Sequence, residues 1–257
     1  MKEHPILFSA PLVRAVLRGQ KTVTRRIAKI PAEGPNKGAL VGVVPSLLRH
    51  GADLFDAQYH MDSHRVVRCP YGAPGDRLWG REATYIAPPN FGDTDLTTHT
   101  DDKGRRRLVG YVASMDRDSH RCAEDYAVKQ TPSIHMPRWA SRLSLEVVSV
   151  RAERLHDIDD ADAEREGVCR WSKDGHLRKY APADAEGDGP CWPWVDCPRS
   201  ARAAFERLWC EVGGAASWAA NPWVWRVEFK RCSPAGEATS AEASASGPTG
   251  TKEGDDA

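Results

Sequence analysis

The stretch SRLSLEVVSVRAERL, residues 141–155, decides the fold. Its apolar side chains fall at every second position, at Leu143, Leu145 and Val147, and the same spacing continues to Ser149. This period of two is typical of a β-strand with one buried face, because successive side chains of a strand point to opposite sides. The stretch therefore predicts a strand that carries these four residues on its core face.

A short acidic helix is expected directly after this strand. In DIDDADAEREG, residues 157–167, either Asp157 or Asp159 suits the N-cap, where a carboxylate accepts hydrogen bonds from free main-chain N–H groups. Further acids in the first turn complement the helix dipole. Gly167 suits the end of the helix, because glycine readily adopts the left-handed conformation that terminates helices.

The stretch NPWVWRVEFKR, residues 221–231, predicts a second strand. Trp223, Trp225, Val227 and Phe229 fall on one face and alternate with Val224, Arg226, Glu228 and Lys230. We expect Trp223 and Trp225 to belong to the core rather than to a platform on which bases stack.

Two other stretches predict helices. SAPLVRAVLRG, residues 9–19, has Ser9 as a candidate N-cap, a proline in the first turn and Gly19 as a left-handed stop. PRSARAAFERLWCEVGG, residues 198–214, is amphipathic and ends at Gly213.

The rest of the chain is less regular. Residues 31–70 are rich in Gly, Pro and His and are expected to be irregular. After them, a Pro-Gly-Asp turn is expected to lead into a short strand at residues 77–82. Residues 86–135 form one long insertion, and residues 169–198 form a second, expected to be a surface loop anchored by tryptophans.

Strands mixed with a few short helices predict an α+β fold with a small, mostly antiparallel sheet or barrel, in one domain over residues 1–232.

Composition limits the classes of protein that the chain can represent. The 257 residues contain 36 Lys and Arg and 36 Asp and Glu, and 40% of them are hydrophobic. No apolar run is long enough for a transmembrane helix, and the N-terminus does not resemble a signal peptide, so a cytoplasmic location without membrane contact is expected. Residues 233–257 hold five acids, one lysine and no aromatic residue, which predicts a disordered acidic tail.

No cofactor or metal is expected from the motifs. The chain lacks the glycine-rich nucleotide-binding motifs and the H-E-x-x-H zinc motif. Seven scattered cysteines fit a reducing compartment. Cys191 and Cys197, with Cys169 and His176 upstream, do not have the spacing of a compact zinc site.

The stretch RGQKTVTRR, residues 18–26, gathers four cations and no acid. It is consistent with a solvated basic turn, with a phosphate-binding segment, or with a reaction centre containing Lys21 and Thr24. In a regular strand Lys21 and Thr24 would point to opposite faces, so they converge only if the chain bends between them. Arg25 and Arg26 are candidate phosphate contacts, since a guanidinium donates two hydrogen bonds at once.

Taken together, four stretches resemble the ASCH domain family, and in particular its phage- and prophage-encoded branch. They occur in one order, and two insertions separate them: ILFSAPLVRAVLRGQKTVTRR, PGDRLWGRE, LSLEVVSVRAERLHDIDDADAEREG and NPWVWRVEF. The resemblance implies a PUA-like β-barrel fold that binds RNA, or a nucleoside or nucleotide, in a basic cleft beside the barrel. For a phage protein the location would be the host cytoplasm.

The same resemblance implies an alternative activity. One branch of the family hydrolyses the amide of acetylated cytidine with a Lys, a Thr and a Glu, which correspond here to Lys21, Thr24 and Glu166. A ribonuclease activity and a role as a phage accessory factor that contacts other proteins are further alternatives.

Other residues are candidates for the cleft or its surroundings. Arg81 and Glu82 either point into the cleft or form a buried salt bridge that closes the barrel. Trp192 and Trp194, in the second insertion, are candidates for stacking on bases, because loops often carry functional residues.

Overall fold

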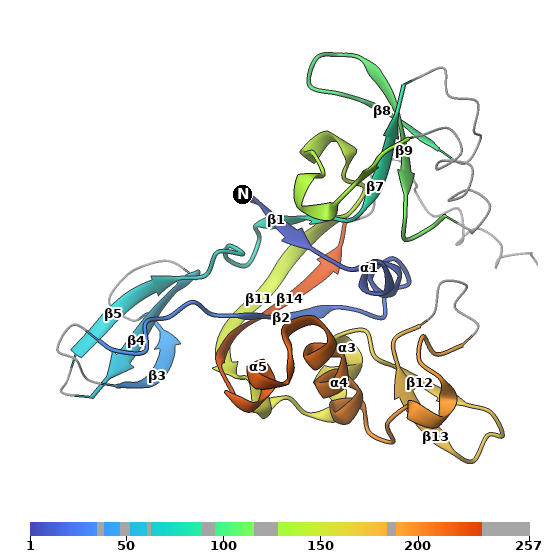
Figure 1. Cartoon of the computed structure of the whole chain (residues 1–257). Coiled ribbons are helices and arrows are strands. Elements are labelled where there is room, and N and C mark those ends of the chain that lie inside the picture. Colours follow the sequence, from blue (N-terminus) through green and yellow to red (C-terminus); the bar gives the residue numbers. More distant parts are fainter. Residues whose placement is uncertain are drawn as a thin grey trace, which may run out of the picture.

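A five-stranded sheet organises the fold, and the chain is a mixed α+β protein as the sequence predicts (Figure 1). The computed structural model describes residues 1–34, 39–46, 52–60, 63–88, 96–115, 128–183 and 189–232. The first two strands of the sheet pair in parallel, and the other neighbours are antiparallel. In spatial order the strands are β1 (Glu3–Leu7), β6 (Arg77–Arg81), β11 (Ser144–Arg154), β14 (Trp223–Arg231) and β2 (Val23–Ile27).

The strand β11 confirms the predicted alternation only up to a β-bulge. Leu145 and Val147 are buried in the core, but the pairing with β14 shifts between Val147 and Ser149. Because a bulge inserts one extra residue, it reverses which side chains face the core beyond it. Val150 and Ala152 therefore pack against the core. Ser149 was wrongly predicted to share the core face, and its hydroxyl instead donates to Glu228 at 3.1 Å.

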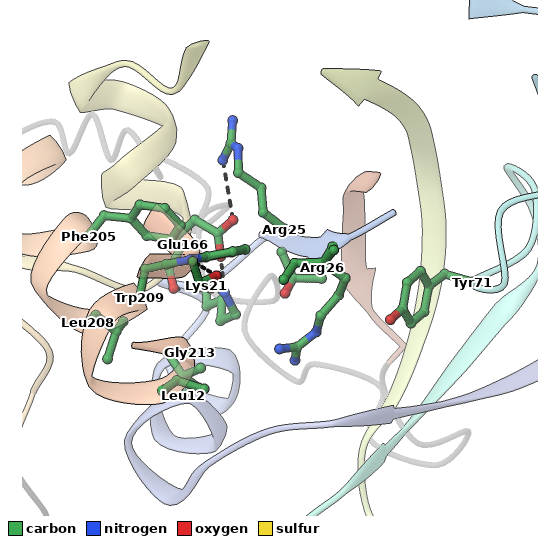
Figure 2. Close-up of a pocket in the computed structure, with 14 residues that line it drawn as sticks. Leu12, Lys21, Arg25, Arg26, Tyr71, Glu166, Phe205, Leu208, Trp209 and Gly213 are labelled. Atoms are coloured by element: carbon green, nitrogen blue, oxygen red, sulfur yellow. Dashed lines mark hydrogen bonds and ion pairs between the residues drawn. The ribbon is translucent and has the colours of Figure 1, made fainter. Parts of the chain in front are cut away.

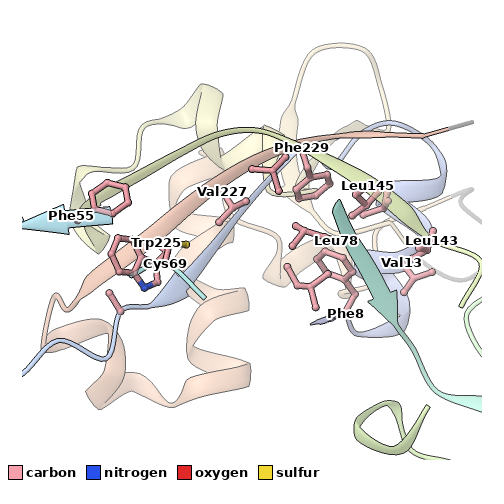
Figure 3. Close-up of a cluster of buried hydrophobic side chains, with 14 of the residues drawn as sticks. Phe8, Val13, Phe55, Cys69, Leu78, Leu143, Leu145, Trp225, Val227 and Phe229 are labelled. Carbon is pink, nitrogen blue, oxygen red and sulfur yellow. The ribbon is translucent and has the colours of Figure 1, made fainter. Parts of the chain in front are cut away.

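The last strand has the predicted pattern. Trp225, Val227 and Phe229 are buried in the core on one face of β14, and Trp223 packs against the same cluster. The prediction that Trp223 and Trp225 belong to the core is therefore confirmed. Figure 3 shows Phe229 among the buried side chains at one end of this cluster and Trp225 at the other.

The five-stranded sheet curls so strongly that its two edges approach each other. β1 and β2 lie at opposite ends of the strand order, yet the guanidinium of Arg26 in β2 donates to the main-chain carbonyl of Leu7 in β1. The same guanidinium lies 5.8 Å from the ring centroid of Phe8. Within the described ranges no main-chain hydrogen bond joins β1 to β2, so the sheet remains open at this seam.

The three predicted helices form where the sequence places them, and a fourth helix at residues 215–219 was not predicted. Ser9 occupies the N-cap position of the first helix, but its side chain makes no capping hydrogen bond, and Gly19 follows the end of the helix with a φ of +73°. Asp159 caps the acidic helix by accepting from the main-chain N–H of Asp162, and Gly167 follows it with a φ of +98°. The helices are α1 (Ala10–Leu17), α3 (Asp160–Arg165), α4 (Ala201–Gly213) and α5 (Ala215–Ala219).

A three-stranded antiparallel sheet occupies most of the region that the sequence predicted to be irregular. Its strands are β3 (Leu40–Pro45), β4 (Leu54–Tyr59) and β5 (Ser63–Arg68). The prediction for residues 31–70 was therefore wrong over these strands. Phe55 of β4 packs on Trp225 with their ring centroids 4.8 Å apart, so this sheet closes one end of the main core.

Both insertions contain strands. The described part of the first forms a four-stranded sheet, and the second contains a hairpin rather than only the surface loop that was expected. These strands are β7 (Thr84–Ala87), β8 (Thr97–Thr100), β9 (Arg106–Tyr111), β10 (Gln130–Thr131), β12 (Cys169–Ser172) and β13 (Arg178–Ala181). The predicted tail at residues 233–257 lies outside the described residues. In the described ranges, no helix combines the length and the apolar character that crossing a membrane requires.

Two strand glycines test how tightly the sheets pack. A Cβ atom on Gly80 of β6 would lie 2.7 Å from the Cβ of Leu143, whereas on Gly42 of β3 the nearest atom would be the flexible Gln58 side-chain oxygen at 3.6 Å. We expect Gly80→Ala to lower the free energy of unfolding by about 1–3 kcal/mol, because overpacking forces the backbone apart. Gly42→Ala should be neutral or stabilising. Urea denaturation of both variants checks this, and equal effects would contradict the packing argument.

Candidate functional site

A cavity of about 280 Å³ lies between α1, the free edge of β2 and the helices α4 and α5 (Figure 2). One side of it is apolar and aromatic, and the other carries the charged residues of the basic stretch. The residues that line it are Leu12, Lys21, Thr24, Arg25, Arg26, Ile27, Tyr71, Glu166, Phe205, Leu208, Trp209, Val212, Gly213 and Ser217.

The apolar wall comes mainly from one face of α4. Phe205, Leu208 and Trp209 recur at helical spacing, so they face the same side. The indole of Trp209 is held in place at one end, where its Nε1 donates to the hydroxyl of Ser217 at 3.0 Å. Trp209 therefore offers the cavity a fixed aromatic surface.

A buried ion pair, Lys21 with Glu166, forms the polar floor of the cavity. The Nζ of Lys21 donates to Glu166 Oε2 at 2.6 Å and to the main-chain carbonyls of Glu166 and Val23, each at 2.8 Å. Three acceptors match the three protons of an ammonium, so this geometry fits the charged form of the lysine. Burial lowers the pKa of Lys21 below its usual value, while the charge of Glu166 opposes that shift.

Lys21 and Thr24 both line the cavity because the chain bends between them. The main-chain N–H of Thr22 donates to Arg165 at 2.9 Å, whereas its carbonyl accepts from Phe229 of β14, also at 2.9 Å. These two bonds join Thr22 to two different elements, so the regular pairing of β2 with β14 ends at Thr22. The Lys21 side chain is therefore not bound by the alternation of faces along the strand. Thr24 is buried, and its hydroxyl has no hydrogen bond to any residue that the structure describes. The structure thus brings Lys21, Thr24 and Glu166 to one cavity.

Arg25, a candidate phosphate contact in the sequence, faces carboxylates inside the protein. Its fully buried guanidinium contacts Glu153 at 2.7 Å, Asp162 at 2.5 Å and Glu166 at 3.3 Å. Figure 2 shows this side chain pointing away from Arg26, as alternation along β2 requires. The charge of Arg25 is therefore matched inside the protein.

Asp162 is the centre of a larger ionic cluster that the sequence did not predict. Arg226 of β14 donates to both of its carboxylate oxygens, at 2.7 and 2.8 Å, and Arg25 and Arg151 also reach it. The hydrogen bonds from Arg226, followed by those from Arg25, hold the pKa of Asp162 well below its usual range. The signal in the sequence was the alternation of Arg226 and Glu228 with buried aromatic residues, which resembles an ordinary solvent-exposed strand face.

Arg26 is a cation of the basic stretch that lines the cavity without an ion pair to any carboxylate that the structure describes. Its side chain lies on the same face of β2 as Thr24 and donates to the Leu7 carbonyl across the seam. Tyr71 lies on the other side of Arg26 from Trp209 (Figure 2). Burial raises the pKa of the Tyr71 hydroxyl, so Tyr71 remains a neutral hydrogen-bonding group at physiological pH.

Arg81 and Glu82 do not belong to the residues that line this cavity. Glu82 is buried and accepts two hydrogen bonds from Arg142, at 2.8 and 2.9 Å. The guanidinium of Arg81 stacks over Trp79 with 5.4 Å to the ring centroid and donates to the carbonyl of Ile134. The sequence left two alternatives open for Glu82, a place in the cleft or a buried salt bridge. In the structure Glu82 forms the buried salt bridge, with Arg142.

The tryptophans and cysteines of the second insertion also lie outside the cavity. Trp192 is buried in the core beside α4, and Trp194 lies beneath the ammonium groups of Lys173 and Lys179. The thiol of Cys197 is buried and donates to main-chain carbonyls. Among the described residues, no group of three or more His, Cys, Asp or Glu side chains is arranged to hold a metal ion.

Substitution of Asp162 tests the ionic cluster. Asp162→Asn removes a charge that several guanidinium groups surround, and we expect it to lower the free energy of unfolding at pH 7 by about 3–5 kcal/mol. Because folding lowers the pKa of Asp162 from 3.8, its stabilisation is present above that value and is lost as the pH falls toward the folded pKa.

The difference between wild type and Asp162→Asn should therefore stay constant from pH 7 to about pH 4 and shrink as the pH falls below 3.8, as measured by urea denaturation. Glu164→Gln, at an exposed position of the same helix, is the matched control and should change little. A difference independent of pH would contradict the role given to the charge.

Comparison with known proteins gives no relative for this chain: no family model, curated protein or solved structure matches it. What the cavity binds is therefore inferred from its own residues and from the resemblance noted in the sequence.

Proposed function

We propose that this chain is a phage-type ASCH-domain protein that binds RNA, or a nucleoside or nucleotide, in the cavity beside Lys21. The four stretches that carry the resemblance contain β6 and β11, most of β2 and β14 and the end of β1, together with α1 and α3. The strands β8, β9, β10, β12 and β13 of the two insertions belong to other sheets. The resemblance therefore coincides with one structural unit, and the cavity lies at its edge.

The shape of this unit supports a PUA-like arrangement. The sheet curls around a single buried cluster, and Arg26 bridges the seam between its two edges. A strongly curved sheet with a nearly closed seam is what a small, partly open barrel requires.

The combination of an aromatic wall and a polar floor carries the functional proposal. Trp209 offers a surface on which a base stacks, while Thr24, Arg26 and Tyr71 offer hydrogen-bonding groups on the other side. Ligand pockets commonly measure roughly 300–1,000 Å³. A cavity of about 280 Å³ lies just below that range, which suits one nucleoside rather than a folded RNA element.

The cleft is less basic than the sequence suggests. Glu166 matches the charge of Lys21, and three carboxylates surround Arg25, so Arg26 is left as the cation that faces the ligand. Stacking and hydrogen bonds therefore supply more of the proposed affinity than phosphate contacts do. With one phosphate contact, the logarithm of the affinity should fall with the logarithm of salt concentration with a slope of about −0.7.

Substitution of Trp209 tests the binding proposal. We expect Trp209→Leu, which keeps an apolar side chain but removes the aromatic surface, to weaken binding of cytidine and of short single-stranded RNA by roughly tenfold to a hundredfold. This estimate follows from a stacking contribution of about 1–3 kcal/mol per base. Titration calorimetry measures the change.

Trp194→Leu is the matched control, because Trp194 lies outside the cavity. It should bind like wild type. If the wild-type protein bound none of the four ribonucleosides and no single-stranded RNA, the proposal would be abandoned.

Amide hydrolysis is the second candidate function, favoured by the unpartnered hydroxyl of Thr24 beside the Lys21–Glu166 pair. A threonine hydroxyl attacks a carbonyl only when a neighbouring group accepts its proton. Lys21 is suited to that role once it has lost a proton, since burial lowers its pKa. In this scheme Thr24 takes the acyl group, the amine of cytidine leaves with a proton, and water then releases the acid.

Turnover of acetylated cytidine tests this candidate. Thr24→Val should abolish turnover, whereas Thr22→Val, the same change two residues away, should retain most of it. The value of kcat/KM should rise with pH up to the lowered pKa of Lys21, because only the neutral amine accepts a proton. Absence of turnover in wild type, or equal turnover in both variants, would leave binding as the function.

A further inference from the structure

The main chain of β2 has one edge that no other strand covers within the described part of the chain. Hydrogen-bonded residue pairs alternate with non-bonded pairs along an antiparallel ladder. The bonds from Ala28 N to Trp223 O and from Phe229 N to Thr22 O, both 2.9 Å, fix which pairs are bonded. The N–H and C=O groups of Thr24 and Arg26 therefore face β14. Those of Arg25 and Ile27 point away from it.

The residues that carry these outward groups are part of the cavity lining. Arg25 and Ile27 both line it, although the guanidinium of Arg25 is turned away toward carboxylates. No described residue forms a hydrogen bond with the main-chain N–H or C=O of either residue on this edge. On the same edge, the carbonyl of Val23 already accepts from Lys21, and Thr22 is bonded to Arg165. The open edge is therefore short, from Arg25 to Ile27.

We propose that this open edge of β2 pairs with the hydrogen-bonding edge of a nucleobase that stacks on Trp209. This inference depends on the proposed function and specifies how the ligand is recognised. A strand edge presents N–H and C=O groups in turn, and the pairing edge of every base presents donors and acceptors side by side. Main-chain groups in a cavity need such partners, because leaving them unpaired away from water is costly.

The dimensions of the edge favour a base over an added peptide strand. Peptide segments that extend a sheet need a long free edge with side-chain pockets on alternate sides. Here the edge spans three residues, and it opens into a cavity sized for one small molecule. The aromatic wall formed by α4 also matches the flat face of a base.

This arrangement selects for unpaired bases. A base whose pairing edge contacts β2 has no edge left for a complementary strand. The ligand class is therefore a free nucleoside or nucleotide, or a nucleotide in single-stranded RNA, rather than duplex RNA.

Ile27→Pro tests the inference, because proline removes the N–H of residue 27 and nothing that β14 uses. Proline is tolerated on an edge strand, and Arg26 already has the extended conformation that a following proline requires. Ile27 is 49% exposed, so little packing is lost. Ile27→Ala is the matched control, since it shortens the side chain and keeps the N–H. We expect Ile27→Pro to bind uridine and cytidine about tenfold more weakly than Ile27→Ala does.

A second measurement needs no variant. Wild-type protein should bind 3-methyluridine at least about tenfold more weakly than uridine, because the methyl group blocks the pairing edge while leaving the stacking face intact. Equal affinities for uridine and 3-methyluridine would overturn the inference, as would equal binding by Ile27→Pro and Ile27→Ala. If Trp209→Leu weakened binding but one of these equalities held, only the contact with the edge of β2 would be overturned. The proposed function would then stand. Lack of binding by wild type would overturn both.

Discussion

The carboxylate of Asp162 and the guanidinium groups around it hold the candidate site together. Asp162 belongs to α3, a helix of six residues that is too short to be stable alone. Its contacts reach Arg25 on β2, Arg226 on β14 and Arg151 on β11, so one carboxylate links the helix to three strands. Buried charges are tolerated only when they are fully paired, and here each has several partners. Glu166 follows directly after α3, so this linkage sets its position beside Lys21.

The elements with long, regular patterns could be predicted from the sequence. The final strand and the helices α1, α3 and α4 were predicted because alternation, caps and terminal glycines agree with one another there. Two of the features that the sequence analysis missed have a clear physical reason. Ser149 was assigned to the wrong face because nothing in the sequence of β11 signals a bulge. The strands at residues 40–68 were missed because side chains on both faces of β3 and β5 are partly exposed, which removes the apolar alternation.

The candidate site was predictable only in part, and for a physical reason. The resemblance identified Lys21, Thr24 and Glu166, and all three line the cavity. The role of Arg25 was misjudged because the charges that neutralise it lie more than 120 residues away, at Glu153 and Asp162. A local run of cations shows how much positive charge a segment carries. It does not show how much of that charge is left without a carboxylate partner after folding.

The packing of Phe55 against Trp225 has a consequence for how much of the chain is separable. The sheet formed by β3, β4 and β5 shares the main core, so its removal would open that core to water. The four-stranded sheet of the first insertion has its own small cluster around Val109, Tyr111 and Met136. The sheet of β3, β4 and β5 is therefore an integral part of the main core. The sheet of the first insertion packs on its own cluster, so its loops could change length with little effect on the main core.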